Sequence, residues 1–399
     1  MLKMDADYQE NLRLLTDRVG HVSIQYEDQL IVVWGGYDRS KEESSSYYEP
    51  SEIVMFNVMT RQIQTVTTTG DIPPKTCGSS AVVQHKSMYV MGGFITEGAF
   101  VENTNAIYCL NLATKNWSKI EPQVLNDHPQ FLKADKLSAW AFDCEIFVFG
   151  GYGPAPENSN EKYPAWMHHV LDPEYLRGWS NQLVIYNVSN NTLKWAESFG
   201  DIPGPRAAHA TVCDKEARRV YLFGGRFGSD RLQDFYWGDL SHANGIRWVQ
   251  LKRSEGQIWP SGRSWHTLNL VGQGLLLLYG GYDKHRRPLN DCWLFDVELS
   301  QWTKLKHHCK EFRLWHTAHH IQALDSVFLF GGVRHDILKN VPDMHPGTLD
   351  RIQLSPLSLS QLALKVVKEN PRHYRKFLTL LPLNVQMQII HYYAQVEGS

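Results

Sequence analysis

Six short apolar runs each end in a pair of glycines: IVVWGG (31–36), MYVMGG (88–93), IFVFGG (146–151), VYLFGG (220–225), LLLYGG (276–281) and VFLFGG (327–332). The first glycines of these pairs, Gly35, Gly92, Gly150, Gly224, Gly280 and Gly331, are separated by 57, 58, 74, 56 and 51 residues. Short runs of β-branched and aromatic residues are typical of buried strands, and the glycines predict a turn without room for a side chain. One unit repeated six times argues against the two or three unrelated domains that 399 residues would otherwise suggest.

Each unit contains further strand signals around its glycine pair. A strand that opens with a basic residue, and often with His, precedes most pairs, as in RVGH (18–21), PRAAH (205–209), GRSWH (262–266) and RLWH (313–316). An alternating strand such as IYCLNL (107–112) follows, and a fourth strand usually starts with Trp, at Trp117, Trp195, Trp248 or Trp302. Four strands per unit of about 50 residues are typical of kelch repeats, and we expect an all-β, six-bladed β-propeller over residues 1–355. The strand tryptophans are then expected to pack between neighbouring blades.

Two units depart from this pattern. The first has Ile63 where a Trp is expected, and the sixth has no clear fourth strand after LDRIQL (349–354). Because propellers often close with a terminal strand, residues 8–15 (YQENLRLL) are a candidate for the missing edge. From Pro356 the apolar residues follow a helical spacing, so residues 356–399 are expected to form a short α-helical tail. The tail is too small for a core of its own and needs a partner surface.

Composition narrows the class of protein. The net charge of −2 excludes a generally basic nucleic-acid binder, although a local basic patch remains possible. The six cysteines stand singly, with no C-x-x-C pair, which disfavours zinc ribbons and disulfide frameworks and fits a reducing compartment. The longest apolar run is far shorter than the roughly 20 residues that span a bilayer, and the N-terminus carries acids where a signal peptide would be apolar. We therefore expect an intracellular protein that binds neither nucleic acid nor membrane.

Strand alternation places one set of loops on one face of the propeller. The loops between the second and third strands of each blade, and the junctions into each first strand, open on the same side. This predicts that Lys133, Lys136, Arg226, Arg231, Arg263, Ser264 and Trp265 share a face with the long loop 152–181, which carries Tyr163, Trp166, His168, His169, Arg177 and Trp179. Arginines offer planar forks for a carboxylate, and aromatics offer apolar walls. The group suits an anion such as a peptide carboxylate, with phosphate as the competing ligand.

Alternative interpretations exist for these residues. Arg231 could simply pair with Asp230 or Asp234, and Arg226 with a neighbouring acid. His316 and its neighbours resemble metal ligands, but His21, His209 and His266 occupy the same repeat position, which favours a structural, hydrogen-bonded histidine. The sequence contains no G-x-S-x-G elbow or glycine-rich phosphate loop, so we expect no catalytic residues, metal or cofactor.

Several stretches are more specific than a general kelch pattern. The chain from about residue 16 resembles the family of kelch domain-containing proteins one and two. Members of this family are substrate receptors of cullin-RING ubiquitin ligases. The resemblance lies in VWGGY (33–37), GDIPPKTCGSSAV (70–82), DKLSAW (135–140), FGGYG (149–153), RGW (177–179), PRAAHA (205–210), FGGR (223–226), GRSWHTL (262–268) and RLWHTA (313–318). The family binds the C-terminal ends of target proteins, favouring a terminal glycine.

The resemblance implies a role for individual residues of the shared face. Arg226, Arg231 and Ser264 would hold the terminal carboxylate of a target. The pocket around them would be lined by Lys136, Tyr152, Tyr163, Trp179 and Trp265. Close aromatic walls would disfavour a bulky terminal residue. The blade-three loop (154–175) departs from the pattern of the family, so the resemblance assigns no preference upstream of the terminal residue.

The tail carries the second part of the resemblance. Residues 358–367 (SLSQLALKVV) are similar to an Elongin C-binding box, with Leu359, Leu362, Ala363 and Val366 as contacts and Ala363 where many boxes have Cys. Leu381, Pro382 and Val385 are similar to a cullin-2 box. The alternative is a tail that only packs on the propeller rim.

Three classes of function compete on this reading. The first is a non-catalytic substrate receptor in the cytoplasm and nucleus, with Elongin B/C, cullin-2, its RING subunit and Gly-ended targets as partners. The second is an interaction scaffold, for instance cytoskeletal, and the third is a kelch-fold enzyme or metal protein. We favour the receptor. Because the chain ends in Gly398-Ser399, its own terminus could also enter the pocket of a second copy.

Overall fold

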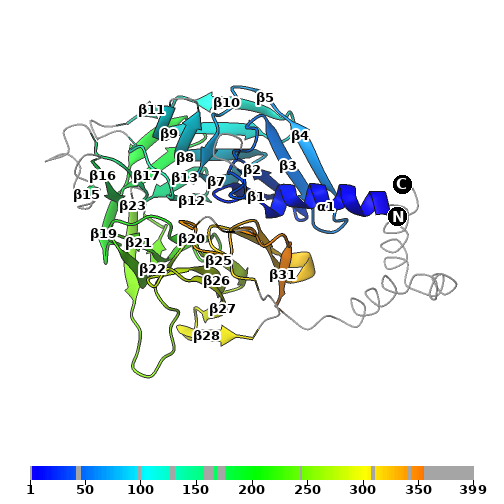
Figure 1. Cartoon of the computed structure of the whole chain (residues 1–399). Coiled ribbons are helices and arrows are strands. Elements are labelled where there is room, and N and C mark those ends of the chain that lie inside the picture. Colours follow the sequence, from blue (N-terminus) through cyan, green and yellow to red (C-terminus); the bar gives the residue numbers. More distant parts are fainter. Residues whose placement is uncertain are drawn as a thin grey trace, which may run out of the picture.

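The computed structural model describes residues 2–354 except 42–45, 98–99, 126–130, 157–165, 169–175, 243–244, 307–310, 340 and 342. Its strands form seven sheets, six of which are arranged as the blades of a β-propeller with antiparallel main strands (Figure 1). This confirms the all-β, six-bladed kelch prediction. The tail residues Leu359, Leu362, Ala363, Val366, Leu381, Pro382 and Val385 and the terminal Gly398 and Ser399 lie outside the described residues. No described helix is long and apolar enough to cross a bilayer.

The first three blades each take four consecutive main strands from one repeat. Blade one contains β1 (Val22–Tyr26), β2 (Leu30–Trp34), β3 (Glu52–Asn57) and β4 (Ile63–Thr67). Blade two contains β7 (Ser80–Gln84), β8 (Ser87–Glu97), β9 (Phe100–Asn111) and β10 (Asn116–Ile120), with the short β5 (Thr69–Gly70) and β6 (Thr76–Cys77) at its ends. Blade three contains β12 (Ser138–Phe142), β13 (Glu145–Phe149), β17 (Leu183–Asn187) and β18 (Thr192–Trp195), with β11 (Gln123–Val124) at its outer edge.

The remaining blades follow the same order. Blade four contains β20 (Ala210–Asp214), β21 (Arg219–Phe227), β22 (Asp230–Asp239) and β23 (Gly245–Leu251), with β19 (Glu197–Gly200) outside. Blade five contains β25 (Thr267–Gly272), β26 (Leu275–Asp283), β27 (Pro288–Asp296) and β28 (Gln301–Leu305), with β24 (Arg263–Ser264). Blade six contains β29 (Thr317–Ile321), β30 (Ser326–Phe330) and β31 (Asp350–Gln353), with a 3-10 turn at Gln322–Leu324.

The paired glycines lie where two neighbouring blades come closest. A Cβ on Gly224 would stand 2.7 Å from the backbone oxygen of Arg263 in the next blade. A Cβ on Gly225 would stand 2.9 Å from the Cβ of His209 in its own blade. Both glycines also have positive φ angles, +64° and +109°. The pair is therefore required by contact on both sides as well as by backbone conformation, as the sequence predicted.

The strand tryptophans pack between blades as expected. Trp248 of blade four is fully buried against Phe149 of blade three, with ring centroids 5.5 Å apart. Trp302 of blade five packs in the same way on Phe223 of blade four, at 5.6 Å. These contacts account for much of the aromatic excess of the chain.

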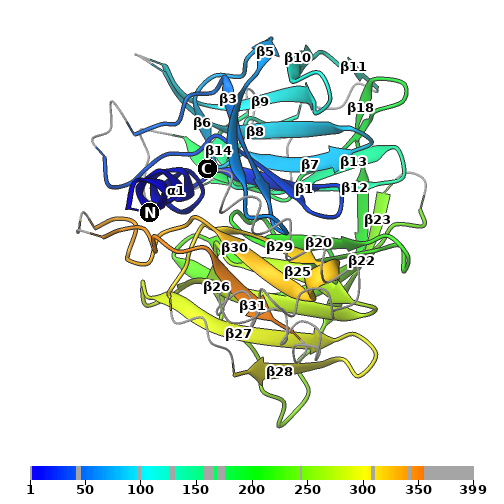
Figure 2. The same ribbon diagram turned by 90° about the vertical axis from the view of Figure 1, so that its right-hand side faces the viewer.

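Residues 8–15 do not form the missing strand of blade six, so that prediction was wrong. They belong to helix α1 (Leu2–Thr16), and the described part of blade six has three strands. Leu15 is fully buried in a cluster that joins blade one, through Phe56, to blade six, through Phe328 and Phe330. Ile63, the smaller replacement for Trp, packs on this same cluster. Helix α1 thus fills the junction between first and last blades that a tryptophan fills elsewhere (Figure 2).

Candidate functional site: an arginine pair enclosed by aromatic side chains

A ring of six equivalent residues surrounds the propeller axis on one face. Each precedes a first strand and has a left-handed backbone with φ between 54° and 68°: Gly20, Gly78, Lys136, Ala208, Trp265 and Trp315. Successive members are joined by backbone hydrogen bonds, for example from Trp265 N to Ala208 O (2.8 Å) and from Trp315 N to Trp265 O (2.9 Å). We call these six residues the axial ring. The repeat therefore brings one side-chain position from every blade to the same central surface.

The residue after each glycine pair lies next to this ring. These residues are Tyr37, Phe94, Tyr152, Arg226, Tyr282 and Val333. Each pairs through its backbone with the residue just before an axial-ring member, as Arg226 does with Ala207 and Tyr282 with Ser264. The expectation that these two sets of loops share a face is confirmed.

The side chains predicted from the sequence to form the site lie next to one another in a nearly continuous series. The rings of Tyr152 and Trp179 lie 5.0 Å apart, and the Arg226 guanidinium lies 5.8 Å from the Trp179 ring. Arg226 and Arg231 are directly opposite each other on β21 and β22.

This series of neighbouring side chains continues through the later blades. The Arg231 guanidinium lies 6.0 Å from the Trp265 ring, which stacks on the Trp315 ring at 5.3 Å. The Lys136 ammonium lies 5.4 Å from the Trp315 ring, and Lys136 follows Asp135, whose backbone pairs with that of Tyr152. The structure thus brings Lys136, Tyr152, Trp179, Arg226, Arg231 and Trp265 around one site.

The two arginines have no acid to neutralise them among the described residues. Arg226 Nε donates to the backbone oxygen of Gly228 (2.9 Å). Arg231 Nη1 makes only long contacts of 3.4 Å to the backbone oxygens of Ser229 and Asp230, and its Nε is buried without a described partner. The alternative pairing of Arg231 with Asp234 is wrong, because Asp234 is bound by Arg206.

Burial makes this pair electrostatically expensive. Burial and the facing charge of Arg226 lower the pKa of Arg231 to about 10. Burial also lowers the pKa of Arg226. Both groups remain cationic at neutral pH, at a cost in free energy that a bound anion would offset.

Three other arginines of the repeat, by contrast, are paired with aspartates inside the blades. Arg206 binds Asp234 through two hydrogen bonds of 2.7 and 2.8 Å and donates to Gly224 O. Arg263 binds Asp291 and Gly280 O in the same way, and Arg313 binds Asp350 and Gly331 O. All three are buried. Arg263, placed by sequence on the shared face, therefore has a structural role, and Arg226 and Arg231 stand apart from this set.

The other predicted site residues differ in their placement. The Lys136 ammonium forms an ion pair with Asp135, which reduces the charge it offers to a ligand. Ser264 is fully buried, and its hydroxyl has no hydrogen-bond partner among the described residues. Lys133 forms an exposed ion pair with Glu102 at 2.9 Å. Tyr163 lies outside the described residues.

Trp315 was not among the predicted site residues, yet its ring stacks on Trp265 and lies 5.4 Å from the Lys136 ammonium. A Cβ on Gly20 would stand 3.1 Å from Cζ2 of Trp315, and a Cβ on Gly78 would stand 3.4 Å from the same atom. The indole therefore reaches from blade six to blades one and two, where the axial ring has no side chains. The match between GRSWH and RLWH, which places Trp265 and Trp315 at the same repeat position, was the available signal.

The long blade-three loop adds a small sheet beside the site. Its strands are β14 (Tyr152–Pro154), β15 (Trp166–His168) and β16 (Arg177–Ser180), in the order β14-β16-β15. Arg177 donates to Asn103 Oδ1 and lies 4.9 Å from the Tyr152 ring. This sheet places Trp179, which is almost fully buried, against Arg226.

The repeated histidines are buried structural groups. His316 lies 3.1 Å from Thr267 Oγ1, and His21 lies 3.0 Å from Thr317 Oγ1. His209 and His266 instead pack edge-on against Phe149 and Phe223, and no described side chain hydrogen-bonds to their rings. The structural prediction holds, and side-chain hydrogen bonds are made by two of the four. Within the described ranges no group of three or more His, Cys, Asp or Glu side chains could hold a metal ion.

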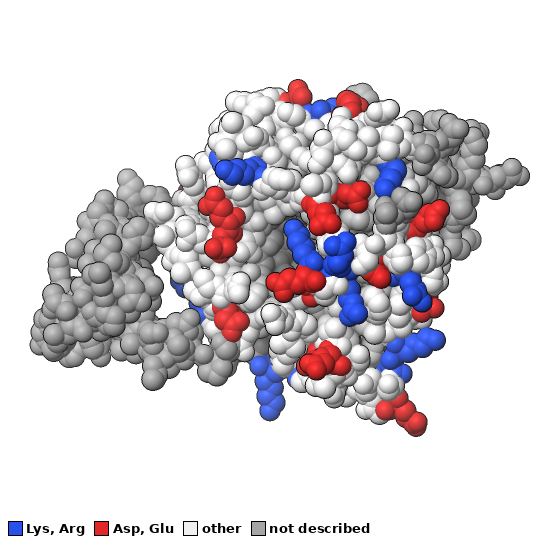
Figure 3. All heavy atoms as spheres, turned by 180° about the vertical axis from the view of Figure 1, so that it is seen from behind, with Lys and Arg blue, Asp and Glu red and all other residues white. Residues whose placement is uncertain are grey.

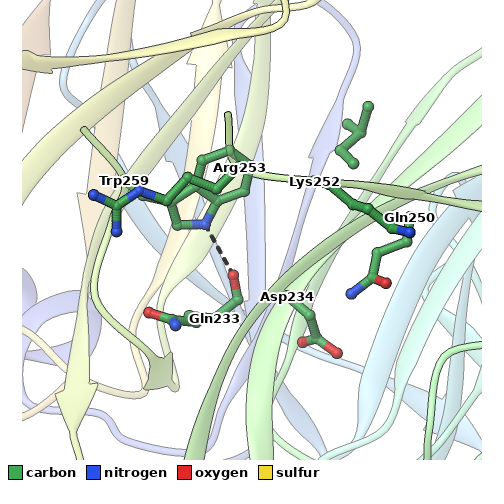
Figure 4. Close-up of a pocket in the computed structure, with 7 residues that line it drawn as sticks. Gln233, Asp234, Gln250, Lys252, Arg253 and Trp259 are labelled. Atoms are coloured by element: carbon green, nitrogen blue, oxygen red, sulfur yellow. Dashed lines mark hydrogen bonds between the residues drawn. The ribbon is translucent and has the colours of Figure 1, made fainter. Parts of the chain in front are cut away.

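A pocket lies on the outer side of blade four. It has a volume of about 300 Å³ and is lined by Gln233, Asp234, Gln250, Leu251, Lys252, Arg253 and Trp259. Figure 4 shows the Trp259 indole donating to the backbone oxygen of Gln233, at 2.9 Å. Since Asp234 is already bound by Arg206, this pocket offers little directed chemistry.

Charged side chains are clustered unevenly on the surface of this nearly neutral protein. Seen from the side opposite to Figure 1, several Lys and Arg side chains gather beside a hollow near the middle of the molecule, with acidic side chains around them (Figure 3). A net charge of −2 therefore says little about any one site.

Comparison with known proteins agrees with this architecture. The KLHDC2/KLHL20/DRC7 Kelch-repeats domain matches residues 20–180 and 172–374. The chain is 31% identical to Kelch domain-containing protein 2 of Bos taurus over 88% of this chain and 84% of the relative, and 28% identical to Kelch domain-containing protein 1 of Mus musculus over 94% and 89%. Host cell factor 2 of Homo sapiens is 24% identical over 72% of this chain but only 35% of its own length. This chain belongs to the KLHDC2/KLHL20/DRC7 kelch-repeat family.

Proposed function

We propose that this protein is a non-catalytic receptor that binds the C-terminal carboxylate of other proteins. The observation that carries the proposal is the pair Arg226 and Arg231, half-buried, directly opposite each other and without an acid partner among the described residues. The fully buried arginines described in blades four to six, Arg206, Arg263 and Arg313, each pair with an aspartate. Two guanidinium groups in a partly desolvated site match a bidentate anion.

The surrounding groups favour a carboxylate at a chain end. Arg226 and Arg231 would bind the two oxygens, and the Ser264 hydroxyl, buried without a described partner, would serve as a further donor after a small shift of its neighbours. Trp179 and Trp265 flank the arginines, and the Trp315 ring forms the floor. Rigid aromatic walls on both sides leave room for glycine more readily than for a branched residue, which supports a preference for Gly-ended targets.

The second half of the proposal is a role in a cullin-2 ubiquitin ligase. Its support is the sequence of the tail, where residues 358–367 resemble an Elongin C-binding box and Leu381, Pro382 and Val385 a cullin box. On this proposal Elongin B/C, cullin-2 and its RING subunit are the partners, and the complex acts in cytoplasm and nucleus.

Co-purification separates the ligase proposal from a scaffold role. Full-length protein co-expressed with Elongin B and C is expected to purify with both in equal amounts. The double substitution Leu359→Ala and Leu362→Ala should abolish this without changing peptide binding. A wild-type chain that never retains Elongin B/C would leave the carboxylate receptor in place and refute the ligase role.

A further inference from the structure

The loop between the second and third strands of blade six supports the arginine site from behind. It runs from Val333 to Thr348, and we call its described residues the blade-six strap. Ile337 and Met344 are buried in a cluster with Tyr282 and Leu314, and the rings of Trp265 and Trp315 pack against the same cluster. The strap therefore connects blade six with the wall formed by blade five.

One charged residue of the strap reaches this wall directly. Tyr282 Oη donates a hydrogen bond of 2.7 Å to Asp336 Oδ1, and Arg286 Nη2 lies 2.8 Å from Asp336 Oδ2. Asp336 is buried and also accepts a hydrogen bond from the Leu338 backbone nitrogen (3.1 Å). Although burial alone would raise the pKa of Asp336, the bonds from Tyr282 and Leu338 and the charge of Arg286 hold it below the usual value. Asp336 is thus an ionised acceptor for the Tyr282 hydroxyl at neutral pH.

The other side of Tyr282 faces Arg231. The Arg231 guanidinium lies 5.4 Å from the centre of the Tyr282 ring, closer than the 6.0 Å to the Trp265 ring. Only 2% of Tyr282 is exposed, so its ring is shielded from solvent. The two aromatic rings lie beside the Arg231 guanidinium together with two long hydrogen bonds of 3.4 Å to backbone oxygens.

We propose that Asp336 is a positioning residue for ligand recognition, acting through Tyr282 to hold Arg231 in place while leaving its charge free. The inference rests on the proposed carboxylate function. A phenol that donates to a carboxylate becomes more electron-rich, and its ring attracts a cation more strongly. An acid in direct contact with Arg231 would neutralise it; an acid acting through the ring holds it without competing with the ligand.

Two substitutions separate the parts of this arrangement. Tyr282→Phe keeps the ring but removes the hydroxyl that donates to Asp336 and accepts a long hydrogen bond (3.4 Å) from Arg286 Nε. Asp336→Asn keeps an oxygen acceptor but removes the charge. Asp343→Asn is the matched control, since Asp343 lies on the same strap, is 81% exposed and contacts only Arg334 among the described residues.

The first readout is discrimination between a Gly-ended peptide and its C-terminal amide. Tyr282→Phe should weaken binding of the free-acid peptide about five- to tenfold, and Asp336→Asn about threefold, with the weak binding of the amide unchanged. Asp343→Asn should match the wild type. Equal discrimination by wild type and Tyr282→Phe would overturn the positioning role and leave the proposed function intact.

The second readout needs no peptide and so remains decisive if the proposed function fails. In protein labelled with ¹⁵N-arginine, the Arg231 Nε–H signal can be assigned by its loss in Arg231→Lys. Tyr282→Phe and Asp336→Asn should shift this signal and speed its exchange with water, whereas Asp343→Asn should not. An unchanged Arg231 signal in both test variants would show that Asp336 does not position the arginine.

Discussion

Arg226 and Arg231 are register partners on adjacent strands of one blade, so their like charges face each other across a two-stranded ladder. No described carboxylate lies within ion-pair distance of either residue. Like charges opposite each other in a sheet destabilise it, and partial burial adds to the penalty. The protein keeps a feature that costs folding free energy, which is the usual sign of a binding site.

Arg231→Ala should remove ligand binding without removing the fold. Loss of one member of a buried, hydrogen-bonded charge pair costs about 2–5 kcal/mol, so affinity for a Gly-ended peptide should fall at least tenfold. Thermal stability should stay the same or rise, because an unpaired buried charge is removed. Lys215→Ala is the control, since Lys215 is an exposed cation in the turn after β20. Comparable affinity loss in both variants would show a non-specific charge effect.

Arg263→Ala should behave in the opposite way. Arg263 is fully buried and binds Asp291 at 2.6 and 2.9 Å, so its removal leaves Asp291 without its partner. We expect a loss of about 3–5 kcal/mol in the free energy of unfolding, measured by urea denaturation. If Arg263→Ala were as stable as Arg231→Ala, the division between structural and ligand-binding arginines would be wrong.

Acid should destabilise the propeller through its buried histidines. Burial lowers the pKa of His266 to about 3, below the ordinary value near 6.5 that applies in the unfolded chain. The unfolded state therefore binds more protons between about pH 6.5 and 3. The stability contribution is complete above pH 6.5 and falls by about 1.4 kcal/mol per pH unit below it.

The repeat itself supplies the control for this pH effect. Blade three carries Leu137 at the position of His266, so His266→Leu should be tolerated and should reduce the dependence of the melting temperature on pH between 4 and 6.5, to which the other buried histidines still contribute. An unchanged pH profile would mean that His266 does not titrate on unfolding as described.

Helix α1 should contribute to closure of the propeller. Leu15 is fully buried between the first and last blades, and a buried Leu→Ala substitution costs about 2–5 kcal/mol. We expect Leu15→Ala to lower the free energy of unfolding by that amount, and Tyr8→Ala, at an exposed position of the same helix, to leave it nearly unchanged. Similar small effects of both changes would place α1 outside the cooperative core.

The sequence predicted the blades well because their signal is local and repeated. Glycine pairs, strand alternation and the interblade tryptophans each recur with a fixed spacing, and the same alternation identified the face that carries Arg226 and Arg231. Helix α1 was not predicted, although Leu12 and Leu15 are three residues apart, as on one helical face, because its short apolar run YQENLRLL also suits an edge strand that closes the ring.

Sequence spacing alone could not predict which arginines pair with an aspartate and which do not. Arg263 is next to Ser264 and Trp265 in the sequence, yet its guanidinium binds Asp291, which is 28 residues away. Arg231 has Asp230 and Asp234 as near neighbours, yet makes no ion pair with either. Partner choice at these positions depends on strand register and on which side chains reach the blade interior. Tyr282 and Asp336 were missed for the same reason, since they are 54 residues apart.

The central claim is that the arginine pair recognises a carboxylate at a chain end. The most direct measurement is a calorimetric titration of the wild-type protein with one short Gly-ended peptide, as the free acid and as the C-terminal amide. We expect the free acid to bind at least tenfold more tightly, because only the free acid carries a negative charge that can pair with Arg226 and Arg231. Equal affinities for the two peptides, or binding of inorganic phosphate in preference to the free acid, would contradict the claim.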